Sequence, residues 1–279
     1  MKSQLGYPSF DERMPELNRF IVNLTKEYNA GNITSWDNLD ERVKKFFTPE
    51  QMSEFETIVP GWKKMASYSD GITLTHVTCV FLGLFMLPEF QKLSENQQQL
   101  AKWIVLFHDI DKLHVRGKKD TLHAFRSGAV AANILPNIGF PISVQYHVFI
   151  APWTTLTVNA FVEDHNKPWQ KPDNTKLPEI LAGIDQLFGE DTAATIIVKT
   201  CLLHISLSVD PHYNTPAPLT DEEVKQFISP ALFPLLRVMM LVDNEGWSMF
   251  DPETRARQRR DTLEAFAKIE LMVNEEAKL

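Results

Sequence analysis

The chain has few cysteines, with only Cys79 and Cys201 among its 279 residues. Both lie in apolar stretches that we expect to be helical, where a free thiol packs as a small hydrophobic side chain. Two such thiols do not form the disulfide framework of small secreted proteins. The cysteine content therefore favours a reducing compartment, and we expect a cytoplasmic protein.

Long apolar runs are also missing. The longest extends from Val77 to Pro88, whereas a membrane-spanning helix needs about 20 residues. The first six residues lack the apolar core that a signal peptide requires. We therefore expect neither a membrane span nor a signal peptide.

The sequence also lacks an excess of positive charge. The 28 Lys and Arg residues are outnumbered by 36 Asp and Glu residues, which gives a formal net charge of -8. General nucleic-acid binding usually needs a basic surface, so no strong nucleic-acid signal is present, although a local basic pocket stays open. The 44% hydrophobic and 23% charged residues are typical of a globular protein. They leave the oligomeric state unknown.

Strand signals are few, and turn signals separate helix-length segments, so the sequence predicts an all-α fold. Capping signals mark helix starts at Thr48, Ser94 and Thr220. The Ser94 helix should end at the pair His108-Asp109. The other expected helices span residues 11–29, 36–47, 71–87, 121–135, 141–151, 177–188, 191–207, 230–249 and 252–277.

A chain of this length can form one large domain. We expect a single α-helical domain over residues 1–279, with its core at about 70–250, an N-terminal helical extension over 1–65 and a C-terminal surface helix over 252–279. Residues 163–178 are polar and proline-rich and form the best candidate for a mobile lid or an insertion, and residues 211–218 form a second expected loop. In the last helix, the arginines alternate with acids as on a solvated helix face: Arg255, Arg257, Arg259 and Arg260.

The most informative feature is the pair His108-Asp109 at the end of an apolar helix, followed by Lys112. Imidazole and carboxylate are both ligands for divalent metals. The apolar residues that precede the pair would bury it, and burial without a partner is costly. Either a metal ion or a full set of hydrogen bonds must satisfy these side chains.

Two further polar residues lie in apolar surroundings. His76 occupies a segment of core-forming residues, and 32 residues separate it from His108, enough for two packed helices. Asp243 follows the apolar stretch 238–242 and also needs a partner. Each residue alone is more often a core or surface residue than a metal ligand.

Taken together, these residues resemble the HD superfamily of metal-dependent phosphohydrolases. The order is His76, then His108-Asp109, then a distant Asp243, and the stretch from Phe107 to Lys112 is similar to the family's FHDIGK, with Asp111 where glycine is usual. The segment that starts at His123 resembles a helix found in the HD domains of tRNA nucleotidyltransferases. The resemblance covers residues 72–150 and 237–247.

The resemblance implies an HD-domain-like helical bundle with additional N- and C-terminal helices. It also implies that four residues bind a divalent metal: His76, His108, Asp109 and Asp243. Two neutral imidazoles and two carboxylates give a neutral ligand field around a 2+ ion. The ion is Mn, Fe, Co, Ni, Zn or Mg, and the sequence does not choose among them.

A second ion depends on further histidines. In branches of the family with two metals, extra histidines lie near the places of His123 and His147, and Asp109 would bridge the ions. His204 is a rival to His147. With one ion, His123 would instead contact a substrate phosphate or act as an acid.

The predicted substrate-binding residues are Lys112 and Arg126. Lys112 lies one helical turn after His108, and the alternative to a phosphate contact is a pair with Asp109 or Asp111. The family match implies catalytic roles for Asp109, Lys112 and His123. The basic loop that follows is either solvated surface or an attractor for an anionic substrate: Arg116, Lys118 and Lys119.

Three functions remain. The first is hydrolysis of a nucleotide or other small phosphorylated metabolite. The second is oxygen activation by two irons, as in HD-fold enzymes that resemble inositol oxygenase, and it requires six ligands. The third is a non-catalytic helical module. The chain lacks the polymerase half of a tRNA nucleotidyltransferase, so specificity is expected to lie in its unmatched segments, especially 152–230.

Overall fold

The protein is all-α in its described residues, as the sequence predicts. A computed structural model describes residues 6–64, 71–113, 120, 122–160, 174–207 and 219–276, and within these ranges no strand forms. No described helix is long and apolar enough to cross a membrane. The loop expected at 211–218, most of the loop expected at 163–178, and Arg116, Lys118 and Lys119 lie outside the described residues.

The described residues form the following helices. A 3-10 turn spans Trp62–Lys64. The α-helices are α1 Phe10–Arg13, α2 Pro15–Asn29, α3 Trp36–Phe46, α4 Pro49–Ile58, α6 Ile72–Met86, α7 Pro88–Gln91, α8 Glu95–Phe107, α9 His123–Ile138, α10 Tyr146–Asn159, α11 Leu177–Phe188, α12 Ala193–Leu203, α13 Asp221–Phe227, α14 Phe233–Trp247 and α15 Pro252–Glu276.

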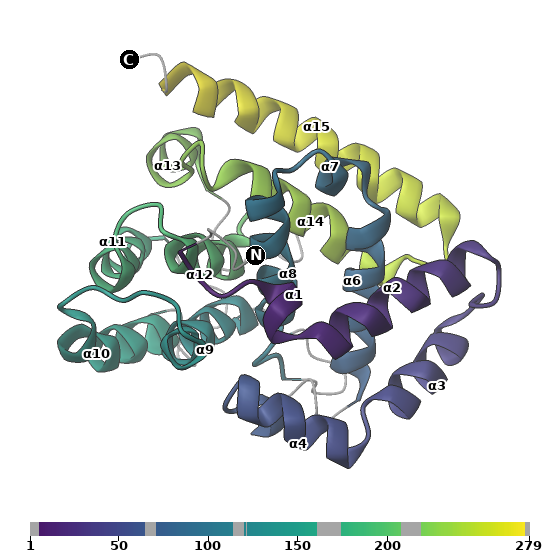
Figure 1. Cartoon of the computed structure of the whole chain (residues 1–279). Helices are drawn as coiled ribbons and strands as arrows, with labels where there is room; N and C mark the ends of the chain where they lie inside the picture. The colour runs from purple at the N-terminus through teal and green to yellow at the C-terminus, as the bar shows by residue number, and fades with distance from the viewer. Residues whose placement is uncertain are drawn as a thin grey trace, which may run out of the picture.

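Three helices, α6, α8 and α14, form the middle of the molecule (Figure 1). The helices α9 to α12 gather on one side of them, α2 to α4 gather on the other, and α15 lies across one end. Every residue from Thr73 to Leu84 of α6 is buried, as expected for a helix that is apolar all round. His76 therefore lies on a helix that no solvent reaches along most of its length.

The middle helix α8 delivers His108 to the interior. Ser94 and Gln97 form the capping box that the sequence predicts, and α8 ends with His108 as its C-cap. All nine residues from Gln99 to Phe107 are buried. The turn that follows therefore starts inside the core.

Two helix predictions need correction. The expected helix 11–29 is two helices, because Pro15 disfavours helical geometry at Met14, which has φ -123° and ψ 50°. The expected helix 141–151 begins only at Tyr146 and continues to Asn159. The residues before it are bound to the end of α11, where the backbone N–H of Ser143 donates to Leu187 O at 2.9 Å and the Ser143 hydroxyl donates to Gln186 O.

Two of the four arginines of α15, Arg255 and Arg259, are less solvated than predicted, whereas Arg257 and Arg260 are exposed as expected. Glu245 of α14 is 2% exposed. Its carboxylate accepts from Arg255 Nε at 2.8 Å and from Arg259 Nη1 at 2.6 Å, and Arg259 Nη2 also donates to Glu89. A buried carboxylate without partners would be costly, so these ion pairs bind α15 to the helix that carries Asp243.

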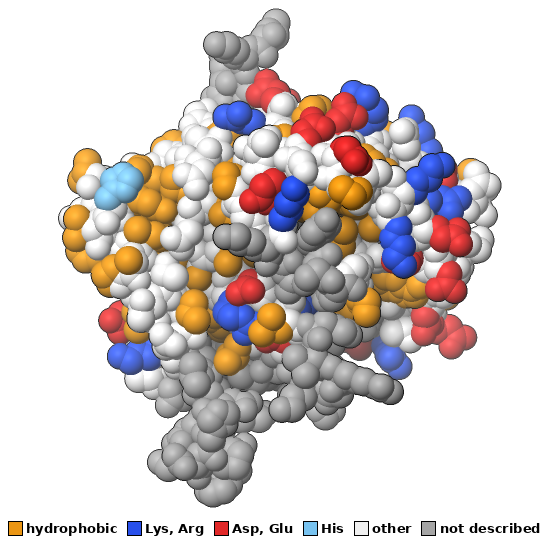
Figure 2. Space-filling view, turned by 90° about the horizontal axis from the view of Figure 1, so that it is seen from below, with side chains coloured by type: hydrophobic (Ala, Val, Ile, Leu, Met, Phe, Trp, Pro, Cys, Tyr) orange, Lys and Arg blue, Asp and Glu red, His pale blue; other side chains and the backbone are white. Residues whose placement is uncertain are grey.

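The outer face of α10 differs from the rest of the surface. Residues 127–162 contain no Asp, Glu, Lys or Arg, and Val144, Val148 and Phe149 are exposed. Seen from below, the flank on the side of α10 carries mainly hydrophobic and uncharged side chains, whereas charged side chains gather on the opposite flank (Figure 2).

The close contact between α6 and α14 predicts opposite effects for two glycine substitutions. In Gly246→Ala the new Cβ would lie 2.7 Å from Val80 Cγ2 and 3.2 Å from His76 Cε1. We expect this crowding to lower the free energy of unfolding by about 1–3 kcal/mol, despite alanine's higher helix propensity.

Gly83→Ala is the matched control on the facing helix. Its Cβ would lie at an ordinary van der Waals distance of 3.5 Å from Met249 Cε. The change in the free energy of unfolding should then follow alanine's higher helix propensity, so this free energy should stay the same or rise by up to about 1 kcal/mol. Chemical denaturation of both variants measures the difference. Equal effects would contradict the packing described for this interface.

Candidate metal centre

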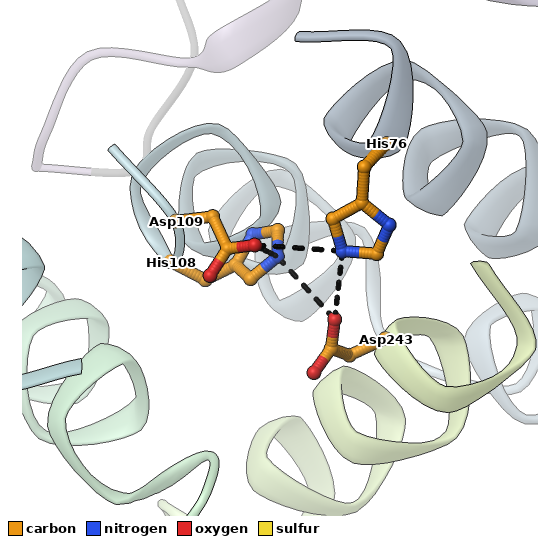
Figure 3. A group of neighbouring side chains, drawn as sticks. All are labelled: His76, His108, Asp109 and Asp243. Carbon is orange, nitrogen blue, oxygen red and sulfur yellow. Dashed lines mark hydrogen bonds and ion pairs between the residues drawn. The ribbon is translucent and has the colours of Figure 1, made fainter. Parts of the chain in front are cut away.

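Three helices bring the four predicted ligands together. His76 comes from α6, His108 and Asp109 from the end of α8, and Asp243 from α14, and their side chains point toward one another (Figure 3). His76 Nε2 lies 3.0 Å from Asp243 Oδ1 and 3.5 Å from Asp109 Oδ2. His108 Nε2 lies 3.6 Å from the same two oxygens. The four ligand atoms all lie within 4.8 Å of one another, which is compatible with one bound metal ion.

The cluster is secluded from solvent. The side chains of His76, His108 and Asp109 are fully buried, and that of Asp243 is 19% exposed. A buried group of this polarity requires either hydrogen bonds or a cation. The chain supplies only part of this requirement, since among the described residues Asp109 Oδ1 and His108 Nε2 have no hydrogen-bond partner.

The orientation of His108 fixes which nitrogen is available. Its Nδ1–H donates to the backbone oxygen of Val105 at 2.8 Å. Nε2 of the neutral ring is then a lone pair that faces two carboxylate oxygens. Metal-binding histidines are commonly oriented through such a hydrogen bond on the other ring nitrogen.

A second group of ligand atoms shares Asp109. Its Oδ1 lies 3.0 Å from His123 Nε2 and 3.9 Å from His204 Nε2, and the two imidazole nitrogens are 3.3 Å apart. These three atoms also lie within 4.8 Å of one another. Asp109 therefore turns Oδ2 to the first group and Oδ1 to the second.

The two histidines of this second group are oriented in the same way as His108. Nδ1–H of His123 donates to Asp120 O, and Nδ1–H of His204 donates to Cys201 O. In their neutral forms both rings would present a lone pair at Nε2, and two lone pairs at 3.3 Å repel each other. A proton or a metal ion between them removes this repulsion.

The electrostatics of the cluster favour ionised carboxylates. Burial alone would raise the pKa of Asp109, but the charges of Lys112, His108 and His123 outweigh it and hold that pKa well below its usual range. Burial likewise opposes ionisation of Asp243, but the nearby His108 and the hydrogen-bonded His76 lower its pKa. Carboxylates must be ionised to bind a metal ion, and both meet this condition at neutral pH.

The histidines respond differently to the same surroundings. Burial, together with the neighbouring His123, lowers the pKa of His204 to about 3, so this ring is neutral at neutral pH. Burial would also lower the pKa of His108, but the two adjacent carboxylates raise it. With two carboxylates and one lysine, the cluster favours one further positive charge.

Lys112 lies at the rim of the cluster. Its Nζ is 2.6 Å from Asp109 Oδ2, and its side chain is 19% exposed. The alternative pairing with Asp109 that the sequence left open is therefore present. A lysine that contacts both a ligand carboxylate and solvent is also within reach of an incoming anion.

Arg126 forms hydrogen bonds and ion pairs with residues that follow Asp109 in the chain. Its Nη2 donates to Asp111 O at 2.9 Å and to the carboxylate of Asp120, and its Nε lies 3.4 Å from Asp111 Oδ2. Asp111 thus has a partner in Arg126. Substrate binding by Arg126 stays a prediction.

His147 does not belong to the centre, which corrects its proposed role as a ligand. It lies on α10, its side chain is exposed, and its ring contacts Tyr146. The reason is the start of α10 at Tyr146, which turns that tyrosine inward and His147 outward. His204, at the end of α12, occupies the place beside His123.

The sequence did not single out Trp247, although its ring stacks on His76 with centroids 4.0 Å apart and 15° between the planes. Residues four apart share one face of a helix. Its position four residues after Asp243 was therefore the available signal.

No family model, curated protein or solved structure matched the chain. Function therefore has to be inferred from the site itself.

Two histidine variants test whether the cluster binds metal. We expect His108→Ala to lose most of the metal that copurifies with the wild-type protein, because it removes a ligand from the first group. His147→Ala should retain the wild-type content, because His147 is exposed and remote from both groups. Elemental analysis of protein purified without chelators measures both.

Thermal unfolding provides a second measurement on the same samples. An ion that binds only the folded state raises its stability, so His108→Ala should also lose the stabilisation that added metal gives to the wild type. Unchanged metal content and unchanged stability in this variant would favour the non-catalytic helical module.

Proposed function

We propose that the protein is a metal-dependent phosphohydrolase of the HD type that acts on a nucleotide or another small phosphorylated metabolite. The observation that carries this proposal is the arrangement around Asp109, where two ligand groups share one buried carboxylate and Lys112 contacts the same carboxylate at the rim. The resemblance of the sequence to the HD superfamily supports it independently.

The donor atoms fit divalent metal ions. The first group offers two imidazole nitrogens and two carboxylate oxygens, a set that suits Mn, Fe, Co, Ni, Zn or Mg. We propose two ions, because the two oxygens of Asp109 face different groups and because Nε2 of His123 and Nε2 of His204 lie 3.3 Å apart on the side of Oδ1. Such ions supply a Lewis acid that polarises a phosphoryl oxygen and lowers the pKa of water.

Three residues of the chain have separate roles in this proposal. Lys112 would bind a phosphoryl oxygen and stabilise the negative charge that grows there during the reaction. Asp109 holds Lys112 in place and orders both ligand groups. His123 is a ligand in a centre with two ions, and its alternative role as an acid applies to a centre with one.

The role of Lys112 can be tested by truncation. We expect Lys112→Ala to lower kcat/KM for a phosphate ester by roughly 100- to 1000-fold, as does the loss of other groups that stabilise transition-state charge. Metal content should stay at the wild-type level, because Nζ is not among the ligand atoms. Lys92→Ala, at an exposed residue that follows α7, is the control.

Steady-state kinetics on a panel of phosphomonoesters, phosphodiesters and nucleotides provide the measurement. Activity unchanged in Lys112→Ala would contradict the role of this lysine. A metal-loaded wild-type protein without activity on the whole panel would overturn the proposed hydrolase.

Oxygen activation by two irons is the second candidate, and one observation favours it. That chemistry needs six ligands, and the two groups together contain six residues: His76, His108, Asp109, His123, His204 and Asp243. Iron content near two per chain, with oxygen consumption and no phosphatase activity, would establish this candidate instead. Lys112 beside the ligand carboxylate favours the hydrolase.

His204→Ala tests the second ion separately from the first. We expect the metal content to fall from about two ions to about one per chain, because the variant removes a ligand that only the second group uses. Phosphatase activity should fall with it. A wild-type content of one ion that His204→Ala leaves unchanged would contradict the second ion and leave the first group intact.

A further inference from the structure

Trp247 is an exposed tryptophan directly beside a buried polar cluster. Its residue exposure is 42%, whereas Trp62, Trp103 and Trp153 are 0–4% exposed. It is the last residue of α14, one helical turn after Asp243. The face of α14 that holds the proposed ligand Asp243 therefore also holds, one turn later, the partly exposed ring of Trp247.

The ring of Trp247 extends from the buried cluster to the protein surface. It stacks on the His76 ring at 4.0 Å between centroids. The Nζ atom of Lys112 lies 5.3 Å from the Trp247 ring centroid and 2.6 Å from Asp109 Oδ2. The aromatic surface and the proposed phosphate contact are therefore neighbours, and one ligand can reach both.

A second tryptophan from a distant part of the chain lies next to this ring. Trp36, the first residue of α3, has its ring centroid 5.9 Å from that of Trp247, and Phe250 lies 6.0 Å from Trp36. Trp36 is half-buried. The N-terminal helical segment thereby contributes to the aromatic surroundings of the centre.

Packing against His76 needs only one face of the indole. Because Trp247 is 42% exposed, part of its apolar ring is in contact with water, which is unfavourable by itself. Planar rings stack well on such surfaces, and nucleobases stack on exposed tryptophans with little dependence on their identity.

We propose that Trp247 is the base-stacking residue of a nucleotide site, in which the base lies on the exposed part of the indole while the phosphate contacts Lys112. This inference rests on the proposed function and narrows it, because it selects nucleotides over aliphatic phosphorylated metabolites. Trp36 flanks the base from the side of α3 and contributes less, because Trp36 is half-buried.

Two ligands that differ only in the base provide the test. The first is a non-hydrolysable phosphonate analogue of AMP, and the second is the matching ribose phosphonate without adenine. Calorimetry on the metal-loaded full chain measures both affinities without turnover. We expect the AMP analogue to bind at least about fivefold more tightly, since stacking contributes this much or more in other nucleic-acid sites.

Variants of Trp247 assign the difference to the ring. Trp247→Leu should weaken the AMP analogue by about fivefold or more and leave the ribose phosphonate unchanged. Trp247→Phe should retain most of the preference, and Trp36→Leu should lose less than Trp247→Leu. If Trp247→Leu loses metal through its contact with His76, tryptophan fluorescence at verified metal content decides: the AMP analogue, but not the ribose phosphonate, should quench the wild type more than Trp247→Phe, and equal quenching of both proteins would contradict stacking on this ring.

The outcomes separate this inference from the proposed function. Equal affinities for the two analogues in the wild type, both lost in Lys112→Ala, would overturn base stacking and leave the phosphohydrolase standing. Equal weakening of both analogues in Trp247→Leu at full metal content would also overturn base stacking. Binding of neither analogue to the metal-loaded wild type would overturn both.

Discussion

The fully buried carboxylate of Asp109 is the constraint on which the centre depends. An ionised carboxylate in the interior needs positive charge or donors at both oxygens. Lys112, His76 and His108 lie beside Oδ2, while His123 and His204 lie beside Oδ1. These partners come from α6, the end of α8, α9 and the end of α12, so satisfying one side chain fixes the mutual positions of several helices.

The rest of the fold supplies rigid support for these positions. The helix α6 is apolar on all sides and carries His76 as a buried polar residue. Asp243 is positioned by α14, which packs against α6 through Gly246 and is bound to α15 by the ion pairs of Glu245. A ligand held by well-packed helices stays near one geometry, which is what a metal site requires.

The sequence predicted local features better than long-range ones. Capping boxes at Ser94 and Thr220 and the spacing after Thr48 marked three helix starts correctly, because these signals act within one helical turn. The all-α class followed from the same local patterns. The start of α10 could not be predicted this way, because Ser143 holds the preceding segment at the end of α11 through long-range contacts that no local pattern encodes.

For the candidate site, too, the residues marked by local patterns were predictable and those fixed by long-range packing were not. The pair His108-Asp109 was recognisable as a polar interruption of an apolar helix, and the family resemblance added His76 and Asp243. The choice between His147 and His204 depended on which histidine faces His123, and that is set by helix packing over 81 residues of chain. The stacking of Trp247 on His76 and the ion pairs of Arg255 and Arg259 were also long-range contacts that no local pattern encodes.

The central claim is that Asp109 joins two metal sites, and anomalous X-ray diffraction from crystals of protein purified without chelators tests it most directly. The account predicts two anomalous peaks, one beside each oxygen of Asp109, separated by roughly 3.5–4 Å as in other two-metal centres. A single peak at either group, or none at either group in protein with full activity, would contradict it.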